Sequence, residues 1–339
     1  MMLTTKQIMK NSEHFSWQFT RNVKLCLLGV AVICSPQILA GEPLLDEPIK
    51  PIPLTVDVDL KKVALGRLLF HEPRLSGDNT VSCATCHDLK TGGVDRTKVS
   101  IGIKGRKGII NSPTVYNSGL LFRQFWDGRA ETLEDQIDWP VQNPIEMGSQ
   151  WPDVLAKLYD DDKYPGMFKA IYDDGITREN VKNAIAEFER SLITPNSRFD
   201  QYLRGDENAI TAKEKRGYML FKRYGCISCH QGVAVGGNMF QVFGAINSYF
   251  KVRGNITEAD MGRFNVTGNP EDKHVFKVPS LRMVALTPPY LHDGTAKTML
   301  DAEDVMFKFQ LGRKAPKKDK EAMVAFLKTL VGEHPEMKK

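Results

Sequence analysis

The sequence of 339 residues predicts a mainly α-helical protein of two similar units, with few and short strands. One pattern, Cys-x-x-Cys-His, occurs twice, at Cys83–His87 and Cys226–His230. An amphipathic pattern ending in Gly-x-x-Leu-Phe precedes each copy, at Gly66–Phe70 and Gly217–Phe221. Runs of alternating apolar and polar residues, which would indicate strands, are scarce. The repeat therefore favours two units that share one architecture.

The repeated pattern is typical of covalent haem attachment. In Cys-x-x-Cys-His the two thiols add to the haem vinyl groups, and the histidine ligates the iron from one face. A Cys-x-x-Cys pair alone could be a redox dithiol or half of a zinc site. A histidine directly after both pairs disfavours those alternatives. We therefore expect two covalently bound haem c groups in two cytochrome c-like domains packed around a shared interface.

Each predicted unit is a helix, then a haem motif, then loops that wrap the haem. An apolar stripe before the first motif is formed by Val58, Val63, Leu65 and Leu69. The helix before the second motif opens at Thr211–Glu214 with a capping box, in which Thr and Glu side chains satisfy free backbone N–H groups. The apolar faces of these two helices are also ordinary core packing.

Three further segments complete the expected organisation. Helical spacing predicts one helix at Thr177–Ile193 and a closing helix at Asp319–Val331. Thr194–Gly205 reads as a linker between the units, and the proline-rich Gly41–Pro53 reads as an extended arm. Apolar residues on the faces of the two helices are Val181, Ile185, Phe188 and Leu192, and Met323, Phe326, Leu327 and Leu330.

The N-terminus reads as a secretory signal peptide over residues 1–40. Arg21 and Lys24 flank the short apolar stretch Leu25–Cys34, and cleavage is expected after Ala40. Met9 as the true start and retention of the leader as an anchor both remain open. Residues 41–205 then form an N-terminal haem domain. Residues 206–339 form a C-terminal haem domain whose tail is free to pack back on the first. Bacteria attach c-type haem outside the cytoplasm, which agrees with a periplasmic location.

Composition bounds the function class. The hydrophobic fraction is 42% and the charged fraction 26%, as in soluble globular proteins. Four of six cysteines lie in the haem motifs and the other two, Cys26 and Cys34, lie in the leader, so none remains for a disulfide. Removal of residues 1–40 removes four basic residues and one acidic residue, which lowers the formal charge from +5 to about +2. This near-neutral balance argues against nucleic acid as a partner.

Histidines are scarce enough to limit the iron ligands. None lies between His87 and His230, so a second histidine for the first haem would have to be His71, His274 or His292. A methionine thioether would raise the potential of the second haem. Met306 is one candidate for that ligand, although a helical methionine is more often core. Its competitors on sequence grounds are Met239, Met261 and Met283.

From about residue 42 to about residue 332 the chain closely resembles the bacterial dihaem cytochrome c peroxidases. Several specific motifs carry the resemblance: Gly66–Phe70, Pro73–Ser76, Asn111–Thr114, Gln124–Arg129, Gln142–Gly148, Phe276–Arg282, Pro289–Gly294 and Gln310–Gly312. The resemblance implies that hydrogen peroxide reacts at a low-potential first haem. It also implies a high-potential His/Met second haem, which accepts electrons from a small cytochrome c or a copper protein.

By motif position the resemblance also implies roles for individual residues. Met306 would be the distal ligand of the second haem, and Glu146 the peroxidatic acid/base with Gln136 as its neighbour. Trp126 would lie between the haems. Without the resemblance, Glu146 would read as a solvated loop carboxylate and Trp126 as a core aromatic.

The resemblance further implies a calcium ion at the domain interface. Asn111 and the carbonyls of Thr287 and Pro289 would be its ligands, and oxygen ligands suit this hard cation. Family members are often calcium-dependent homodimers, so a homodimer is expected. His292 is expected to contact a propionate or the backbone rather than iron.

One departure from the family pattern concerns the first haem. Many members place a blocking histidine sixteen residues after the first haem histidine, where this chain has Ile103. Isoleucine cannot ligate iron. Either the oxidised first haem is open and needs no reductive activation, or another group such as Lys104 or His71 caps it.

These observations leave three functions to compare. The first is a periplasmic peroxidase that reduces hydrogen peroxide to water. The second is a MauG-like enzyme that oxidises a protein side chain. That family also lacks the blocking histidine, but it typically has tyrosine where Met306 stands. The third is a dihaem electron carrier without catalysis, against which Glu146 and Gln136 beside an open iron argue.

Overall fold

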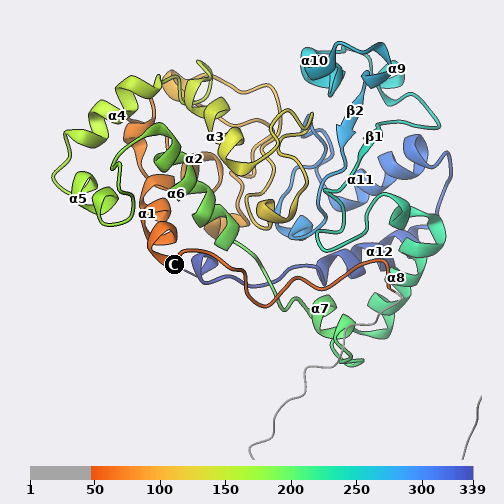
Figure 1. The fold of residues 1–339 in the computed structure, drawn as a ribbon. Helices are drawn as coiled ribbons and strands as arrows, with labels where there is room; N and C mark the ends of the chain where they lie inside the picture. The colour runs from red at the N-terminus through yellow and green to blue at the C-terminus, as the bar shows by residue number, and fades with distance from the viewer. Residues whose placement is uncertain (1–46, 339) are drawn as a thin grey trace, which may run out of the picture. The chain divides into compact units, whose positions relative to one another are not determined.

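A computed structural model describes residues 47–338 of the chain (Figure 1). The predicted signal peptide and the first residues of the arm lie outside the described residues. Among the residues that the structure describes, no helix is long and apolar enough to cross a membrane.

The described chain is mainly helical, as predicted. The helices are α1 Leu60–Phe70, α2 Cys83–Cys86, α3 Leu133–Gln142, α4 Trp151–Tyr159, α5 Tyr164–Lys169, α6 Arg178–Ser191, α7 Arg198–Leu203, α8 Ala212–Tyr224, α9 Tyr249–Arg253, α10 Phe264–Thr267, α11 Met299–Val305 and α12 Lys317–Lys328. Strands β1 Phe240–Val242 and β2 Val275–Lys277 pair antiparallel, with Gln241 opposite Phe276. Long loops and short 3₁₀ turns connect these elements (Figure 1).

Two helix pairs with the same contact form the cores of the two halves. Helix α1 packs on α6, and α8 packs on α12. A Cβ atom at Gly66 of α1 would lie 1.8 Å from the carbonyl oxygen of Ala184, and one at Gly217 of α8 would lie 2.0 Å from that of Ala322. Only glycine permits either approach, because no side chain fits at such a distance. The repeat seen in the sequence is therefore a repeat of one helix crossing.

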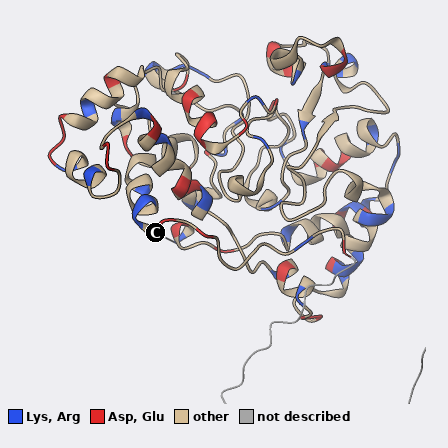
Figure 2. Cartoon of the chain, in the orientation of Figure 1, with Lys and Arg blue, Asp and Glu red and all other residues tan. Residues whose placement is uncertain are grey.

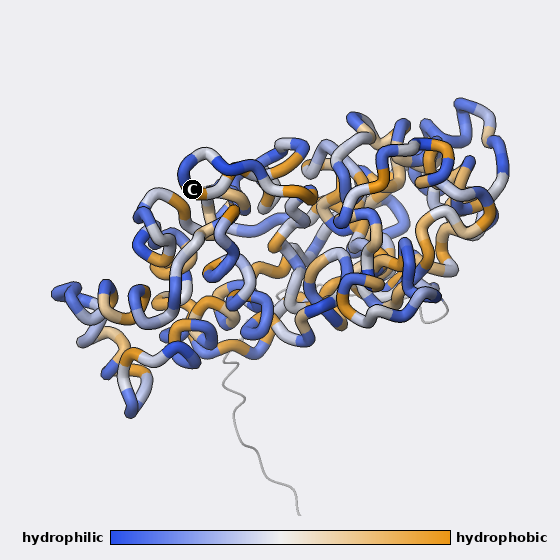
Figure 3. The backbone as a smooth tube through the Cα atoms, turned by 90° about the horizontal axis from the view of Figure 1, so that it is seen from above, coloured by the Kyte–Doolittle hydropathy of each residue, from blue (hydrophilic) through white to orange (hydrophobic). Residues whose placement is uncertain are grey.

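The aromatic packing beside the two crossings repeats as well. Phe70 and Phe188 lie with ring centroids 5.3 Å apart, and Phe221 and Phe326 lie at the same separation. Helices α6 and α12 are thus equivalent, each with an Ala-x-x-x-Phe segment against the glycine. Buried apolar residues gather around each pair. Charged residues occur along helices and loops of both halves (Figure 2), and hydrophilic and hydrophobic residues alternate along the backbone (Figure 3).

The Gly217 contact predicts a large stability difference between two matched substitutions. Gly217→Ala should lower the free energy of unfolding by about 1–3 kcal/mol, because the new methyl group must push α8 and α12 apart. Gly166→Ala in α5 is the control, since nothing lies within 4 Å of a Cβ there. Chemical denaturation of the two variants measures the difference, and equal stabilities would contradict the close crossing.

Helix α8 begins where the sequence predicted, whereas α1 begins later than predicted. Thr211 accepts from the Glu214 N–H in the predicted capping box, and α8 begins at the next residue. The α1 helix begins later than the apolar stripe suggested, because Asp59 caps it by accepting from two N–H groups. Val58 therefore precedes the helix.

The predicted linker Thr194–Gly205 is wrong as a description of structure, because it contains helix α7 and buried polar groups. Thr194, Ser197 and Asp200 are almost fully buried. Asp200 pairs with the Arg282 guanidinium at 2.9 Å, and both side chains are inaccessible to solvent. Polar composition predicted a solvated segment, whereas an internal ion pair holds it inside the protein.

Each end of the described chain contacts the opposite half. Ile49 forms a bridge with Gly232, and the Lys50 N–H donates to the Gly232 carbonyl. After α12 the C-terminal segment reaches α1, where the Arg67 guanidinium donates to Glu336 at 2.8 Å. The two halves are therefore joined by their exchanged ends.

Candidate haem sites

The second motif follows directly on α8. Gly225 ends this helix in the left-handed region at φ 92°, which turns the chain into Cys226–Ser228. The Nδ1 atom of His230 lies 3.3 Å from the carbonyl oxygen of Val235. Burial lowers the pKa of His230 to about 4, so the imidazole is neutral at pH 7. With Nδ1 directed at a carbonyl, Nε2 is the atom left to bind iron.

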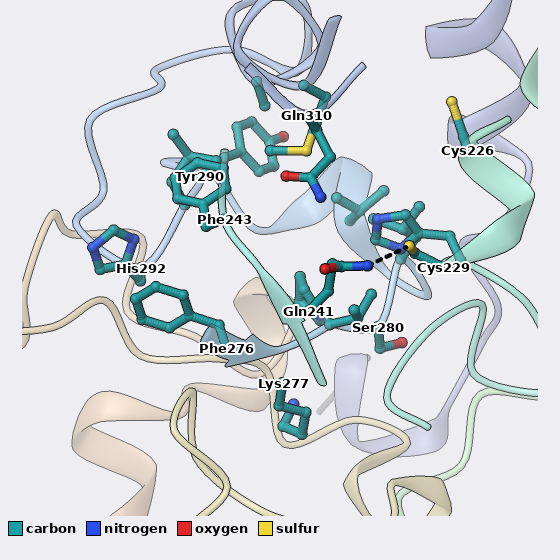
Figure 4. Close-up of a pocket in the computed structure, with 18 of the residues that line it drawn as sticks. Cys226, Cys229, Gln241, Phe243, Phe276, Lys277, Ser280, Tyr290, His292 and Gln310 are labelled. Carbon is teal, nitrogen blue, oxygen red and sulfur yellow. Dashed lines mark hydrogen bonds between the residues drawn. The ribbon is translucent and has the colours of Figure 1, made fainter. Parts of the chain in front are cut away.

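A cavity of about 430 Å³ opens beside this motif (Figure 4). Cys226, Cys229, His230 and Met306 all line it. Figure 4 shows the two cysteines at one side of the cavity and Phe243, Tyr290 and His292 at the other, with Gln310 above. The lining is mostly apolar and includes the helix-pair residues Phe221, Met323 and Leu327. Two thiols, a neutral imidazole and a thioether around an apolar cavity fit a covalently bound haem c.

Met306 stands where a regular helix changes its winding. The chain from Met306 to Gln310 forms a π-turn, in which the Leu311 N–H donates to the Met306 carbonyl at 3.0 Å. Such turns occur often at functional sites. The Gln310 side chain fixes the turn to the β1 loop, since it accepts from the Gly244 N–H at 2.9 Å and donates to the Val242 carbonyl. Of the four candidate methionines, Met306 lines the cavity, and Met239, Met261 and Met283 do not.

The first motif has the same local arrangement. Ser82 and Thr85 form a capping box at the start of α2, which carries both cysteines of the motif. The Nδ1 atom of His87 lies 3.3 Å from the carbonyl oxygen of Gly93, and burial lowers the pKa of His87. Its Nε2 atom is thus the free one, as in His230.

Glu146 lies in the turn after α3, close enough to the first motif for its charge to affect Cys86. Its Oε1 atom accepts from the Asn143 amide at 2.7 Å. Burial raises the pKa of Glu146, while Arg129 and the Asn143 bond act in the opposite direction. Burial raises the pKa of Cys86 to about 11, and the negative charge of Glu146 acts in the same direction. Gln136 is half-buried on α3, and within residues 47–338 no hydrogen bond joins its side chain to Glu146.

Arg129 is a residue of this site that the sequence did not reveal. Its guanidinium lies 3.5 Å from the ring centroid of Phe125 and 4.8 Å from that of Trp139, and it pairs with Asp127 at 2.8 Å. Its Nε is buried without a hydrogen-bond partner. The residue closes the Gln124–Arg129 motif, but its electrostatic effect on Glu146 depends on how the fold places the two side chains.

Ile103 is packed in the protein core. It is 5% exposed, and its N–H donates to the Glu146 carbonyl at 2.8 Å. Its side chain lies against Gly148, where a Cβ would come within 2.3 Å of Ile103 Cδ1. Of the two alternative caps, His71 is exposed with Nδ1 bonded to its own helix at Arg67, and Lys104 is exposed. Ile103 therefore fixes the loop beneath Glu146.

Trp126 lines the cavity beside the second motif and is held at both its side chain and its backbone. Its indole N–H donates to the Asn111 carbonyl at 2.8 Å, and its carbonyl accepts from the Lys277 N–H at 2.8 Å. Asn111, Thr287 and Pro289 line the same cavity as Trp126. The Asn111 amide nitrogen donates to the Thr97 carbonyl at 3.0 Å, so its oxygen is the atom available to a cation.

His292 belongs to a buried ion-pair network. Its Nε2 lies 2.7 Å from the Asp260 carboxylate, and its carbonyl accepts from the Asn111 N–H. Asp260, His292 and Asp293 are close enough to bind a metal ion. Arg253 already bonds to both carboxylates, so the cluster is satisfied without one.

Two ionisable residues that line this cavity also escaped the sequence analysis. Glu303 of α11 lines the cavity with neither carboxylate oxygen hydrogen-bonded, and burial raises its pKa to about 8. Lys277 of β2 lines it as well. Its position within the Phe276–Arg282 motif could have marked Lys277 as functional, but the sequence does not show which group it would bind.

Comparison with known proteins gives the family of the chain. The family model described as di-haem cytochrome c peroxidase matches residues 60–208. The chain is 50% identical to a cytochrome c peroxidase from Escherichia coli (strain K12) over 85% of its own length and 62% of the relative's. It is 43% identical to the cytochrome c551 peroxidase of Nitrosomonas europaea over 94% of its own length and 93% of the relative's.

A solved structure shares the fold at similar coverage. It is a MauG-like protein associated with microbial copper homeostasis, 29% identical with a TM-score of 0.75, covering 86% of this chain and 96% of that one. The repeated helix crossing, the two motifs and these matches lead to one assignment. The chain belongs to the di-haem cytochrome c peroxidase family.

Proposed function

We propose that the chain is a periplasmic peroxidase that reduces hydrogen peroxide to two waters with two electrons and two protons. The observation that carries this proposal is Glu146, a partly buried carboxyl group whose pKa is raised by burial and whose charge acts on Cys86 of the first motif. Residues 41–205 would form the peroxidatic domain and residues 206–339 the electron-accepting domain. Residues 1–40 would direct export.

The two haem c groups would supply redox-active iron, the first for peroxide and the second for incoming electrons. Cys83, Cys86 and His87 would hold the first, and Cys226, Cys229, His230 and Met306 the second. Peroxide must lose a proton from one oxygen and gain one on the other as the O–O bond breaks. Glu146 would accept and return that proton. Asn143 orients its carboxylate, and Gln136 would be its neighbour in the pocket.

Electrons would enter at the second haem from a small cytochrome c or a copper protein. Trp126 would lie on their route to the first haem, since its side chain and carbonyl are both fixed by backbone bonds. A calcium ion held by Asn111, Thr287 and Pro289 would tie the loops on either side of that route. A homodimer is proposed from the family resemblance.

The absence of a ligand at Ile103 predicts that the oxidised first haem is open. Peroxide turnover of the fully oxidised protein and of the half-reduced protein, in calcium, tests this. Equal initial rates with a high-spin first haem are expected. A low-spin first haem with a lag that pre-reduction abolishes would show that another group caps the iron.

A second candidate is a MauG-like oxidase of a protein side chain. Ile103 favours it, because an open first haem would also suit that chemistry, and one structural relative is named MauG-like. The thioether of Met306 in the second cavity argues against it. If the protein turns over peroxide with a small reduced donor protein, the peroxidase function is favoured over the MauG-like oxidase.

Arg129 should set the acidic limb of the pH profile. Because Arg129 lowers the pKa of Glu146, Arg129→Met should raise that pKa and leave less carboxylate at a given acidic pH. The half-maximal point on the acidic side of kcat/KM should therefore move to higher pH. Arg123→Met is the control, since Arg123 pairs with the exposed Glu131. An unmoved limb would mean that Glu146 is not the titrating base.

A further inference from the structure

Lys277 is a buried cation for which the described chain offers no counter-ion. Its side chain is 5% exposed and lines the cavity of the second motif. Within residues 47–338 its ammonium forms no hydrogen bond or ion pair, and burial lowers its pKa to about 8. A buried charge is costly unless it is paired, so an anion is expected at this point of the cavity.

The other charged and titratable groups around the cavity do not supply that anion. Arg282 is fully paired with Asp200 and with the carbonyls of Val233 and Lys50. Glu303 is held neutral by its raised pKa. The imidazole of His292 carries no negative charge and is bonded to Asp260. The anion must therefore come with whatever fills the cavity.

A haem c brings two carboxylates, its propionates, on the edge opposite its vinyl groups. Thioether bonds to Cys226 and Cys229 would fix the vinyl edge, which directs the propionate edge away from the cysteines. Figure 4 shows Lys277 at the lower edge of the cavity, across it from Gln310 and away from Cys226. Of the lining lysines and arginines, Lys277 is the one without an anionic partner.

We propose that the Lys277 ammonium binds a propionate of the second haem and raises the reduction potential of that haem. This inference rests on the proposed function only for the assignment of Cys226–His230 to the second haem. A positive charge beside the haem stabilises the reduced state over the oxidised state. Since the Lys277 N–H also bonds to the Trp126 carbonyl, the same residue places the propionate edge next to Trp126.

Potentiometric titration of both haems in the holoprotein tests the proposal with Lys277→Met, which keeps the chain length and removes the charge. The equilibrium constant for reduction of the second haem should fall at least tenfold, which is about 59 mV for a one-electron couple. The first haem should be unchanged and serves as the internal reference. Lys277→Arg should restore most of the wild-type potential.

Lys273→Met is the matched control, because Lys273 is exposed and lies four residues earlier on the same segment. A shift no larger than in this control, or a shift confined to the first haem, would overturn the proposal. If Lys277→Met does not retain the second haem, Lys277→Gln and Lys277→Arg decide. A potential of the second haem that is lowered in Lys277→Gln but not in Lys277→Arg supports the ion pair, and equal potentials in the two variants overturn it.

The readout separates this proposal from the peroxidase proposal. If the wild-type protein shows no peroxide turnover but Lys277→Met still lowers the potential of the second haem, the ion pair is supported and the peroxidase function is refuted. If the wild-type protein turns over peroxide but Lys277→Met leaves the potential unchanged, the peroxidase function is supported and the ion pair is refuted.

Discussion

Glu146→Gln is expected to lower peroxide turnover by about 10²–10⁴-fold, the range that general acid–base catalysis contributes. The amide keeps the size of the side chain and an oxygen that can accept from Asn143, but it cannot take up a proton. Haem content and reduction of the second haem should survive. Steady-state turnover and haem spectra of the same preparation measure both.

The surroundings of Glu146 explain why one carboxyl can serve both steps. Burial favours the neutral acid, whereas Arg129 and the Asn143 hydrogen bond favour the carboxylate. The opposing effects leave the group able to exchange a proton. Glu131→Gln, a change at an exposed carboxylate before α3, should leave turnover intact. Unchanged turnover in Glu146→Gln would remove Glu146 from the mechanism.

Met306→Leu is expected to lower the reduction potential of the second haem by on the order of 100 mV or more, since axial ligands set haem potentials over about 0.8 V. Leucine has a similar volume and no donor atom, so packing should be retained. With a low potential the second haem would no longer accept electrons from the donor, and donor-driven turnover should fall. Redox titration and donor oxidation rates provide the two measurements.

Met323→Leu is the matched control for that change. Met323 of α12 lines the same cavity, but it is packed between the helices of the second pair. Its replacement should leave the potential near the wild-type value. If Met323→Leu shifts the potential and Met306→Leu does not, the ligand has been misassigned.

The sequence predicted what depends on local chemistry. The Cys-x-x-Cys-His segments, the capping box at Thr211 and the apolar faces of α6 and α12 were all readable from short spacings. The mainly helical fold and the family followed from these and from the longer motifs. The positions of Glu146 and Met306 came from resemblance, and their geometry agrees with the proposed roles without testing them.

What the sequence did not predict depends on contacts across the chain. The equivalence of α6 and α12 lies in Gly66 meeting Ala184 and Gly217 meeting Ala322. Each approach joins segments that are about a hundred residues apart in the sequence, so spacing could not reveal it.

Buried polar groups were missed for the same reason. Asp200 looked like part of a solvated linker, because its partner Arg282 is distant in the sequence. Lys277 looked like an ordinary motif residue, since nothing in the sequence shows that it lacks a partner. Polar residues indicate exposure only until the fold supplies their surroundings.

The central claim is that this chain couples donor oxidation to peroxide reduction through Glu146. Stopped-flow mixing of the holoprotein and a reduced small cytochrome c with limiting hydrogen peroxide measures that coupling directly. The account predicts two donor molecules oxidised per peroxide in the wild type and a loss of that oxidation in Glu146→Gln. Peroxide consumption without donor oxidation, or equal donor oxidation in both proteins, would contradict it.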